Sequence, residues 1–352
     1  MRIEEIDKNF AVKEKNEDDE IVWYDIRRSP FRIYGLFAPE TEPRFHRLPA
    51  QTVKYCNERV TLIENHTAGG RISFKTDSPF IQLKVSCPEI FKMNNMALSG
   101  SAGFDVFCRK NGEFSHIYCL RPADCTQNEW QAFCKTPPGT NDLMLYFPLY
   151  NAVENVYIGL KKGSSLESGD DYETQKPIVF YGSSITQGAA ASRPAMSYEA
   201  LISHRYNLNY INLGFSGCAH GEKAIAEYIA SLDISAFVLD YDHNASGPEH
   251  LIKTHSQFYK TIRKAKPDIP IIVVSRPRPI REEMRLVIKQ TYLDALESGD
   301  KNIAFIDGET LFAGDHYTEC TVEGCHPNDL GFYRMSQVIG NQLEKMLNLK
   351  KR

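Results

Sequence analysis

Short runs of alternating or aromatic-rich character dominate the chain from about Ile21 to Leu160. The clearest of them are Arg71 to Thr76, Ile81 to Ser86, Gly103 to Cys108, Asn141 to Phe147 and Asn155 to Leu160. Gly, Pro and Asn separate these runs, and none has a long helical period. Many short strands with turn signals between them predict an antiparallel β-sandwich. Such a module either binds carbohydrate and shapes a substrate site, or only stabilises the rest of the protein.

After Lys176 the pattern changes to strand-like runs that alternate with longer helix-like runs. The strand-like runs are Ile178 to Tyr181, Tyr210 to Leu213, Ala236 to Tyr241, Ile269 to Ser275 and Asn302 to Ile306. The helix-like runs are Ser197 to Tyr206, Glu222 to Ser231, Pro248 to Ala265, Arg281 to Leu296 and Pro327 to Leu347. This alternation predicts an α/β domain with a parallel sheet and helices on both faces. In such sheets the site lies beyond the carboxyl ends of the strands.

The polar, glycine-containing segment 161–176 separates the two patterns and marks a domain boundary. We therefore expect an N-terminal β-sandwich domain over residues 1–165 and an α/β domain over residues 172–352.

Charge and composition narrow the possible partners. The 352 residues carry a formal net charge of -4 and the pI is about 6.2, so neither nucleic acid nor an anionic membrane is expected as a partner. The N-terminus lacks an apolar signal region and no apolar run reaches bilayer-spanning length, which predicts a cytoplasmic protein. The nine cysteines are odd in number and scattered, which indicates reduced thiols. The oligomeric state stays open.

The stretch P-I-V-F-Y-G-S-S-I-T-Q-G, residues 177–188, holds the first candidate catalytic residue. An apolar strand-like run ends at Gly182, and small and hydroxyl residues lead into a helix start. A serine at such a turn lies near backbone N–H groups that stabilise negative charge. Ser184 is therefore the candidate nucleophile, although a plain loop is the commoner meaning of the stretch taken alone.

Two later loops could complete an oxyanion hole. In N-L-G-F-S-G, Gly214 and Gly217 permit turns that point a backbone N–H into the site. In D-Y-D-H-N-A, Asn244 could donate a side-chain N–H. The same acidic run resembles the start of a calcium loop, but Ala245 and Leu251 stand where such a loop needs glycine and glutamate.

The segment T-V-E-G-C-H-P-N-D-L-G-F contains a candidate base. Pro327 suits the first position of the last helix, which would place His326 at the head of that helix. Glu323 could reach the imidazole Nδ1 and fix its tautomer, leaving Nε2 to take a proton from Ser184.

The same segment also suggests part of a zinc site. Cys320, Cys325 and His326 could serve as ligands, but no second C-x-x-C pair completes the set. No metal or organic cofactor is therefore expected.

Together these motifs resemble the SGNH, or GDSL-type, serine hydrolase superfamily. Residues 182–185 stand in the place of its first block, Gly217 in the second, Asn244 in the third and His326 in the D-x-x-H-P block. The segments G-F-D-V-F, F-H-R-L-P and L-Y-F-P-L-Y-N resemble a subgroup with an N-terminal β-sandwich. Ser183 replaces the aspartate usual beside the nucleophile, and Glu323 replaces the aspartate of D-x-x-H.

The resemblance implies a flavodoxin-like three-layer α/β hydrolase domain preceded by a jelly-roll-like β-sandwich. It implies a carboxylic ester hydrolase in which Ser184 attacks the carbonyl, His326 acts as base and then acid, and Glu323 orients His326. The N–H groups of Ser184 and Gly217 and the Asn244 amide would hold the oxyanion.

The expected substrates are short-chain, mainly acetyl, esters of a carbohydrate or small metabolite, and Arg47 of F-H-R-L-P is a candidate for contacting them. Two alternatives remain. The same acyl-enzyme could pass its acyl group to an alcohol, or the protein could bind glycans without catalysis.

Overall fold

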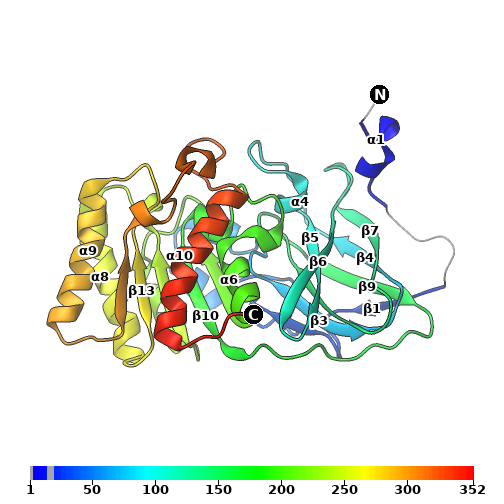
Figure 1. Ribbon diagram of the computed structural model, residues 1–352, viewed down its shortest axis with the longest axis horizontal. Helices are drawn as coiled ribbons and strands as arrows, with labels where there is room; N and C mark the ends of the chain where they lie inside the picture. The colour runs from blue at the N-terminus through cyan, green and yellow to red at the C-terminus, as the bar shows by residue number, and fades with distance from the viewer. Residues whose placement is uncertain (1–2, 14–19) are drawn as a thin grey trace. The chain divides into compact units, whose positions relative to one another are not determined.

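The computed structural model describes residues 3–13 and 20–352 and divides into two compact units (Figure 1). The first unit comprises Met1–His46, Asn65–Asp171 and Arg193–Ala195, and the second comprises Arg47–Glu64, Tyr172–Ser192 and Met196–Arg352. Each unit thus contains a short segment from the other half of the sequence. The segment 47–64, which the sequence pattern groups with the N-terminal domain, belongs to the second unit.

The first unit is an antiparallel β-sandwich, as predicted. One sheet has the order β1 (Ile21–Asp25), β9 (Asn155–Lys161), β4 (Phe80–Ser86), β7 (Glu129–Lys135). The other has the order β2 (Arg32–Tyr34), β3 (Arg71–Thr76), β8 (Asn141–Tyr146), β5 (Phe104–Lys110), β6 (Glu113–Leu120). Inward-facing apolar side chains of both sheets, such as Ile72, Leu83 and Phe104, form one core.

Asp105 of the G-F-D-V-F motif is fully buried in this unit. Its Oδ2 accepts hydrogen bonds from Arg193 Nη1 and from the Ala195 backbone N–H, both at 2.9 Å. A buried carboxylate needs such partners. Asp105 therefore accounts for the place of residues 193–195 within the first unit.

The second unit contains a five-stranded parallel sheet. Its order is β11 (Leu208–Gly214), β10 (Thr174–Gly182), β12 (Ala236–Asp240), β13 (Ile271–Val274), β14 (Ile303–Ile306). The helices are α6 (Tyr198–Tyr206), α7 (Lys223–Ser231), α8 (Pro248–Ala265), α9 (Glu282–Glu297) and α10 (Asp329–Leu347), with short α2 (Ala50–Val53), α3 (Glu58–Ile63) and α5 (Ser184–Gln187). The strand order confirms the predicted flavodoxin-like topology.

Helices cover both faces of this sheet. On one face Phe180 of β10 packs edge-on against Tyr198 of α6, which stacks on Phe332 of α10; α6 and α10 lie side by side in Figure 1. On the other face Tyr181 stacks on Phe258 of α8 with ring centroids 4.7 Å apart. Successive residues of β10 thus enter different cores, as the period of a strand requires.

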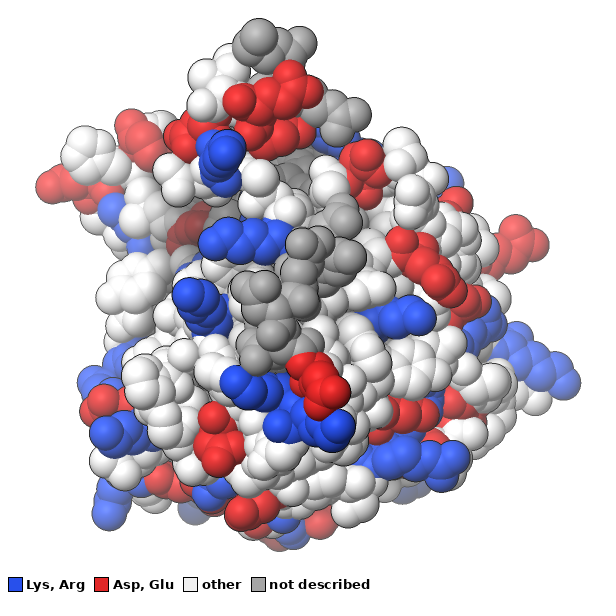
Figure 2. Space-filling view, turned by 90° about the vertical axis from the view of Figure 1, so that its right-hand side faces the viewer, with Lys and Arg blue, Asp and Glu red and all other residues white. Residues whose placement is uncertain are grey.

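Three further observations concern surface charge, the cysteines and the length of the apolar helices. On the face shown in Figure 2, basic and acidic side chains of the described residues are intermixed. All nine cysteines are free thiols. Within residues 3–13 and 20–352, no helix has both the length and the apolar character needed to cross a membrane.

Candidate active site

Ser184 lies at a tight turn between β10 and the single-turn helix α5. Gly182 ends β10, and Ser183 caps α5 by accepting the Ile185 backbone N–H at 3.2 Å. A Cβ atom on Gly182 would come within 2.1 Å of Thr186 Oγ1 and 2.2 Å of the Asp240 carbonyl oxygen. The strand and the turn therefore pack so closely that only glycine fits before the serine pair.

Three of the predicted site residues come together in the structure. Ser184 Oγ is 2.9 Å from His326 Nε2, and His326 Nδ1 is 2.6 Å from Glu323 Oε1. Glu323 Oε1 also accepts the His326 backbone N–H at 2.8 Å. An ionised carboxylate only accepts hydrogen bonds, so this pair places the imidazole proton on Nδ1 and leaves Nε2 as an acceptor for the serine hydroxyl.

The prediction that Pro327 begins the last helix is wrong. Helix α10 begins at Asp329, and Asn328 is its N-cap, with Oδ1 accepting the Gly331 backbone N–H at 3.1 Å. Pro327 instead forms an isolated antiparallel bridge with Thr321. His326 therefore lies in the loop before the helix, within a turn that brings the Glu323 carboxylate to its Nδ1.

The predicted oxyanion donors lie on the loops after β11 and β12. Gly217 has a φ of +70°, and no atom lies within 4 Å of a Cβ built on it. Asn244 Nδ2 donates one hydrogen bond to the Phe215 carbonyl oxygen at 2.9 Å. That bond fixes the amide and leaves its second N–H for a ligand.

Two further side chains hold these loops, and neither was singled out from the sequence. Asn212 donates from Nδ2 to the Thr186 carbonyl oxygen at 2.6 Å and accepts the Gly214 backbone N–H at 2.9 Å. Gln187 Oε1 accepts the Ser216 backbone N–H at 3.0 Å. A Cβ on Gly214 would lie 2.1 Å from the Gln187 backbone nitrogen, so Gly214 serves close packing of the loop against α5.

Buried acids underlie the carboxyl edge of the sheet. Burial, reinforced by the neighbouring Asp242, raises the pKa of Asp240 well above its ordinary value. Burial also raises the pKa of Asp242 to about 6, against the opposing hydrogen bond from the Arg276 backbone N–H. These carboxyl groups lie on the segment that leads to Asn244, and no proposed catalytic step uses them.

Arg47 was a candidate for contacting the substrate because it was expected in a polar, turn-like setting, whereas the structure buries its side chain. Arg47 is 1% exposed, its Nη2 donates to the Ile63 carbonyl oxygen at 2.8 Å, and its Nη1 donates to the Gly214 carbonyl oxygen. Its guanidinium carbon lies 4.6 Å from the centroid of the Phe215 ring. Arg47 thus ties segment 47–64 to the Gly217 loop through backbone carbonyls, and these contacts do not place it to bind a substrate.

Donor atoms of Glu323, Cys325 and His326 lie within 4.8 Å of one another, so these three residues could hold a metal ion. Two of them are hydrogen-bonded to each other as described above, and Cys320 does not belong to the group.

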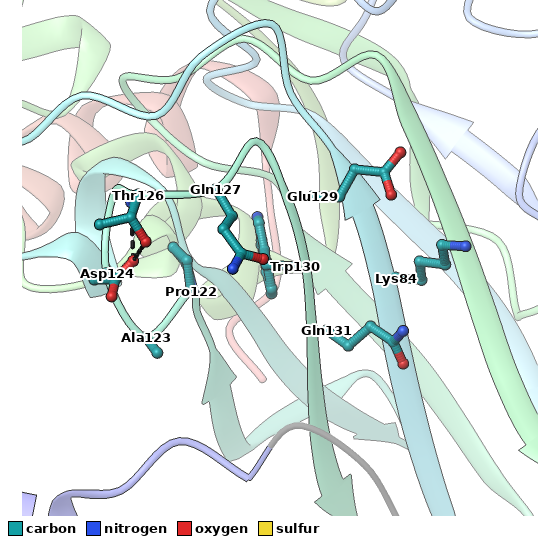
Figure 3. A pocket seen from close by; sticks show the side chains of 9 residues that line it. All are labelled: Lys84, Pro122, Ala123, Asp124, Thr126, Gln127, Glu129, Trp130 and Gln131. Carbon is teal, nitrogen blue, oxygen red and sulfur yellow. Dashed lines mark hydrogen bonds between the residues drawn. The ribbon is translucent and has the colours of Figure 1, made fainter.

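A separate cavity of about 390 Å³ lies in the sandwich unit (Figure 3). Its walls are Lys84, Pro122, Ala123, Asp124, Thr126, Gln127, Glu129, Trp130 and Gln131. Asp124 accepts hydrogen bonds from the Thr126 backbone N–H and hydroxyl, which close the turn at one wall. None of the predicted site residues lines this cavity.

Comparisons with known proteins agree with this description. The sequence model of the GDSL-like lipase/acylhydrolase family matches residues 175–344, and a model of the N-terminus of SGNH-hydrolase-type esterases matches residues 21–166. A protein from Bacteroides ovatus, described as a GDSL-like lipase, is 30% identical, with a TM-score of 0.85 over 95% of this chain and 100% of that one. The comparison with curated proteins found no match.

More distant solved structures share the fold. A salicylyl-acyltransferase from a tetracycline biosynthetic pathway is 18% identical, with a TM-score of 0.75 over 96% of this chain and 100% of its own. A family two carbohydrate esterase from Clostridium thermocellum, solved with cellohexaose, is 14% identical, with a TM-score of 0.62 over 90% of this chain and 99% of its own.

Proposed function

The chain belongs to the GDSL-like lipase/acylhydrolase family and is a carboxylic ester hydrolase, and from that premise we propose that it cleaves short-chain O-acyl esters through a Ser184 acyl-enzyme. The observation that carries the proposal is the unbroken series of contacts from Ser184 Oγ to His326 Nε2 and from His326 Nδ1 to Glu323 Oε1. This is the arrangement that activates a serine for attack on a carbonyl.

Each residue has one task in the proposed reaction. His326 Nε2 removes the proton as Ser184 Oγ attacks the ester carbonyl, and then returns it to the departing alcohol oxygen. Water then attacks the acyl carbon and gives a proton to the same nitrogen, which returns it to Ser184 Oγ as the acid is released. Glu323 stabilises the positive charge on the imidazole while the N–H groups of Ser184, Gly217 and Asn244 stabilise the oxyanion.

For the substrate we propose an acetyl ester of a carbohydrate or of another small metabolite, handled in the cytoplasm. The carbohydrate esterase from C. thermocellum supports this choice by analogy of fold. Initial rates on matched acetyl, butyryl and octanoyl esters, together with acetylated oligosaccharides, test it. A clear preference for octanoyl esters would contradict the short-chain assignment.

An acyltransferase is the second candidate, since the fold is shared with a salicylyl-acyltransferase. The two reactions differ only in what attacks the acyl-enzyme. With an alcohol acceptor added, a hydrolase should still release mainly free acid, whereas a transferase would form new ester as the main product.

A non-catalytic glycan-binding protein is the third candidate, for which the polar cavity of Figure 3 offers a place to bind sugar. It predicts sugar binding without labelling of Ser184 by a fluorophosphonate probe. Labelling of wild-type protein would rule it out.

The central test replaces Ser184 by Ala. We expect hydrolysis of 4-nitrophenyl acetate to fall at least a thousandfold, with the far-ultraviolet circular dichroism unchanged, because the nucleophile is lost and the fold is not. Ser183→Ala is the matched control, since the Ser183 hydroxyl caps α5 by accepting the Ile185 backbone N–H, whereas the contact with His326 is made by Ser184. If Ser183→Ala is inactive and Ser184→Ala is active, the assignment of the nucleophile is wrong.

A further inference from the structure

A buried guanidinium at the carboxyl end of β13 has no task in the reaction proposed above. Arg276 follows two residues after β13, and only 7% of it is exposed. Its side chain makes no hydrogen bond or ion pair with any residue in the described part of the chain, and Nε is fully buried. Burying a cation without a partner is unfavourable, so the arrangement points to an acceptor supplied from outside the chain.

A short series of contacts leads from Arg276 to the loop that holds His326. Its backbone N–H donates to Asp242 Oδ2 at 3.0 Å, which ties the end of β13 to the turn Asp242–Asn244. In that turn, His243 Nδ1 is 4.0 Å from Cys325 Sγ, and Cys325 directly precedes His326. His243 Nε2 is also buried with no hydrogen-bond partner among the described residues.

The electrostatics of this region favour a negatively charged guest. Burial, together with the neighbouring Arg276, lowers the pKa of His243 well below its ordinary value, so the imidazole is neutral. Arg278 and Arg281 follow in the same loop and are exposed. The Asp242 carboxylate accepts the Arg276 backbone N–H, and Asp242 and Asp240 attract the guanidinium through space. Neither carboxylate forms an ion pair with it within the described residues, so its N–H groups still lack an acceptor.

We propose that Arg276 and His243 form a subsite for a carboxylate carried by the ester substrate. The planar guanidinium donates two parallel N–H bonds to a carboxylate, a geometry that a single hydroxyl group does not match. This inference rests on the proposed esterase function and names its preferred substrate class, an ester that bears a carboxylate. The carboxylate belongs to the acyl portion or to the alcohol portion, and the experiment separates the two.

The experiment compares two matched ester pairs. In the acyl pair, 4-nitrophenyl hydrogen succinate is compared with 4-nitrophenyl methyl succinate, and in the alcohol pair 4-acetoxybenzoate is compared with its methyl ester. With kcat/KM divided by the alkaline hydrolysis rate of each ester, we expect wild type to favour the carboxylate member of one pair by about tenfold to a hundredfold, as a charge-assisted hydrogen bond predicts.

Variants locate the cause of that preference. Arg276→Gln should bring the ratio of the two normalised kcat/KM values, carboxylate ester over neutral ester, close to one. Arg276→Lys should leave an intermediate ratio, because lysine keeps the positive charge but cannot donate two parallel N–H bonds. Arg278→Gln is the matched control from the same loop; it removes an exposed arginine 5.1 Å from the Tyr317 ring and should leave the ratio unchanged. A preference that survives in Arg276→Gln, or that is lost in Arg278→Gln, overturns the subsite.

Two further outcomes separate this inference from the proposed function. Turnover of neutral and carboxylate esters by wild type without preference in either pair overturns the subsite and leaves the esterase intact. A binding measurement needs neither activity nor a folded variant: benzoate should raise the Tm of wild type, and the isosteric neutral benzamide should not. Equal shifts with the two compounds overturn the subsite even if no ester is turned over.

Discussion

Replacing Glu323 by Gln measures what the carboxylate charge contributes to the proposed reaction. Glu323 Oε1 accepts both the backbone N–H and the Nδ1–H of His326. A glutamine amide oxygen can accept the same two bonds, so the substitution removes charge while the geometry remains possible. A hydrogen bond to a charged group contributes about 1.5 to 3 kcal/mol.

Exposure lowers the expected effect. The Glu323 side chain is 41% exposed, whereas the template acid of a serine triad is buried, and water screens an exposed charge. We therefore expect kcat to fall by about tenfold to a hundredfold, compared with roughly ten-thousandfold for a buried triad acid.

The assay is kcat on 4-nitrophenyl acetate, combined with ¹⁵N NMR of the His326 ring to report the tautomer. Glu323→Asp serves as the conservative control and should be mild, because aspartate is the residue usual at this position of the family. Near-full activity in both Glu323→Gln and Glu323→Ala would refute the reasoning and indicate a Ser184–His326 dyad. Asp329 is an unsuitable substitute for Glu323, since it already accepts the Ser192 backbone N–H at 2.9 Å.

Three more outcomes are expected. Asn244→Ala should lower kcat by roughly a hundredfold with little change in KM, because the hydrogen bond strengthens as charge develops; a pure KM effect would assign Asn244 to substrate binding. Gly182→Ala should prevent folding or shift the thermal midpoint strongly downward, since its Cβ would lie 2.1 and 2.2 Å from two oxygen atoms; an unchanged Tm contradicts this. Burial lowers the pKa of His255 to about 3, so its contribution to stability is complete above about pH 6.5 and is lost as pH falls toward 3. That loss is about 3 kcal/mol between pH 6.5 and pH 4, and urea unfolding of His255→Gln should show a smaller decline over this range than wild type; parallel declines would contradict it.

Local signals in the sequence were sufficient to predict the fold class and to single out the residues that meet at the turn after β10. Helix α8 begins at Pro248 and ends at Ala265, as its period and its initial proline predicted. Ser184, Glu323 and His326 could be singled out because each lies in a short motif of recognisable chemistry, and the structure brings the three side chains together.

The sequence was less informative where tertiary contacts determine the ends of an element or the burial of a side chain. Strand β6 was not singled out, because it is mostly exposed or half-buried and its alternation is weak. Helix α10 begins at Asp329 rather than at Pro327, because the side chain of Asn328, its N-cap, accepts a free backbone N–H at the helix end. Arg47 was expected in a polar, turn-like setting, whereas Arg47 and its apolar neighbours Phe45 and Leu48 are all buried.

The exchange of short segments between the two units limits how the gene can be divided. Leu48, Val53 and Val60 belong to the core beneath the parallel sheet, although they are encoded more than a hundred codons before it. A truncated gene that starts at codon 161 would therefore specify a hydrolase unit without those core side chains and without Arg47. Fusion proteins, chimaeras and natural recombinants of this family are expected to exchange both units together, because no single breakpoint separates them.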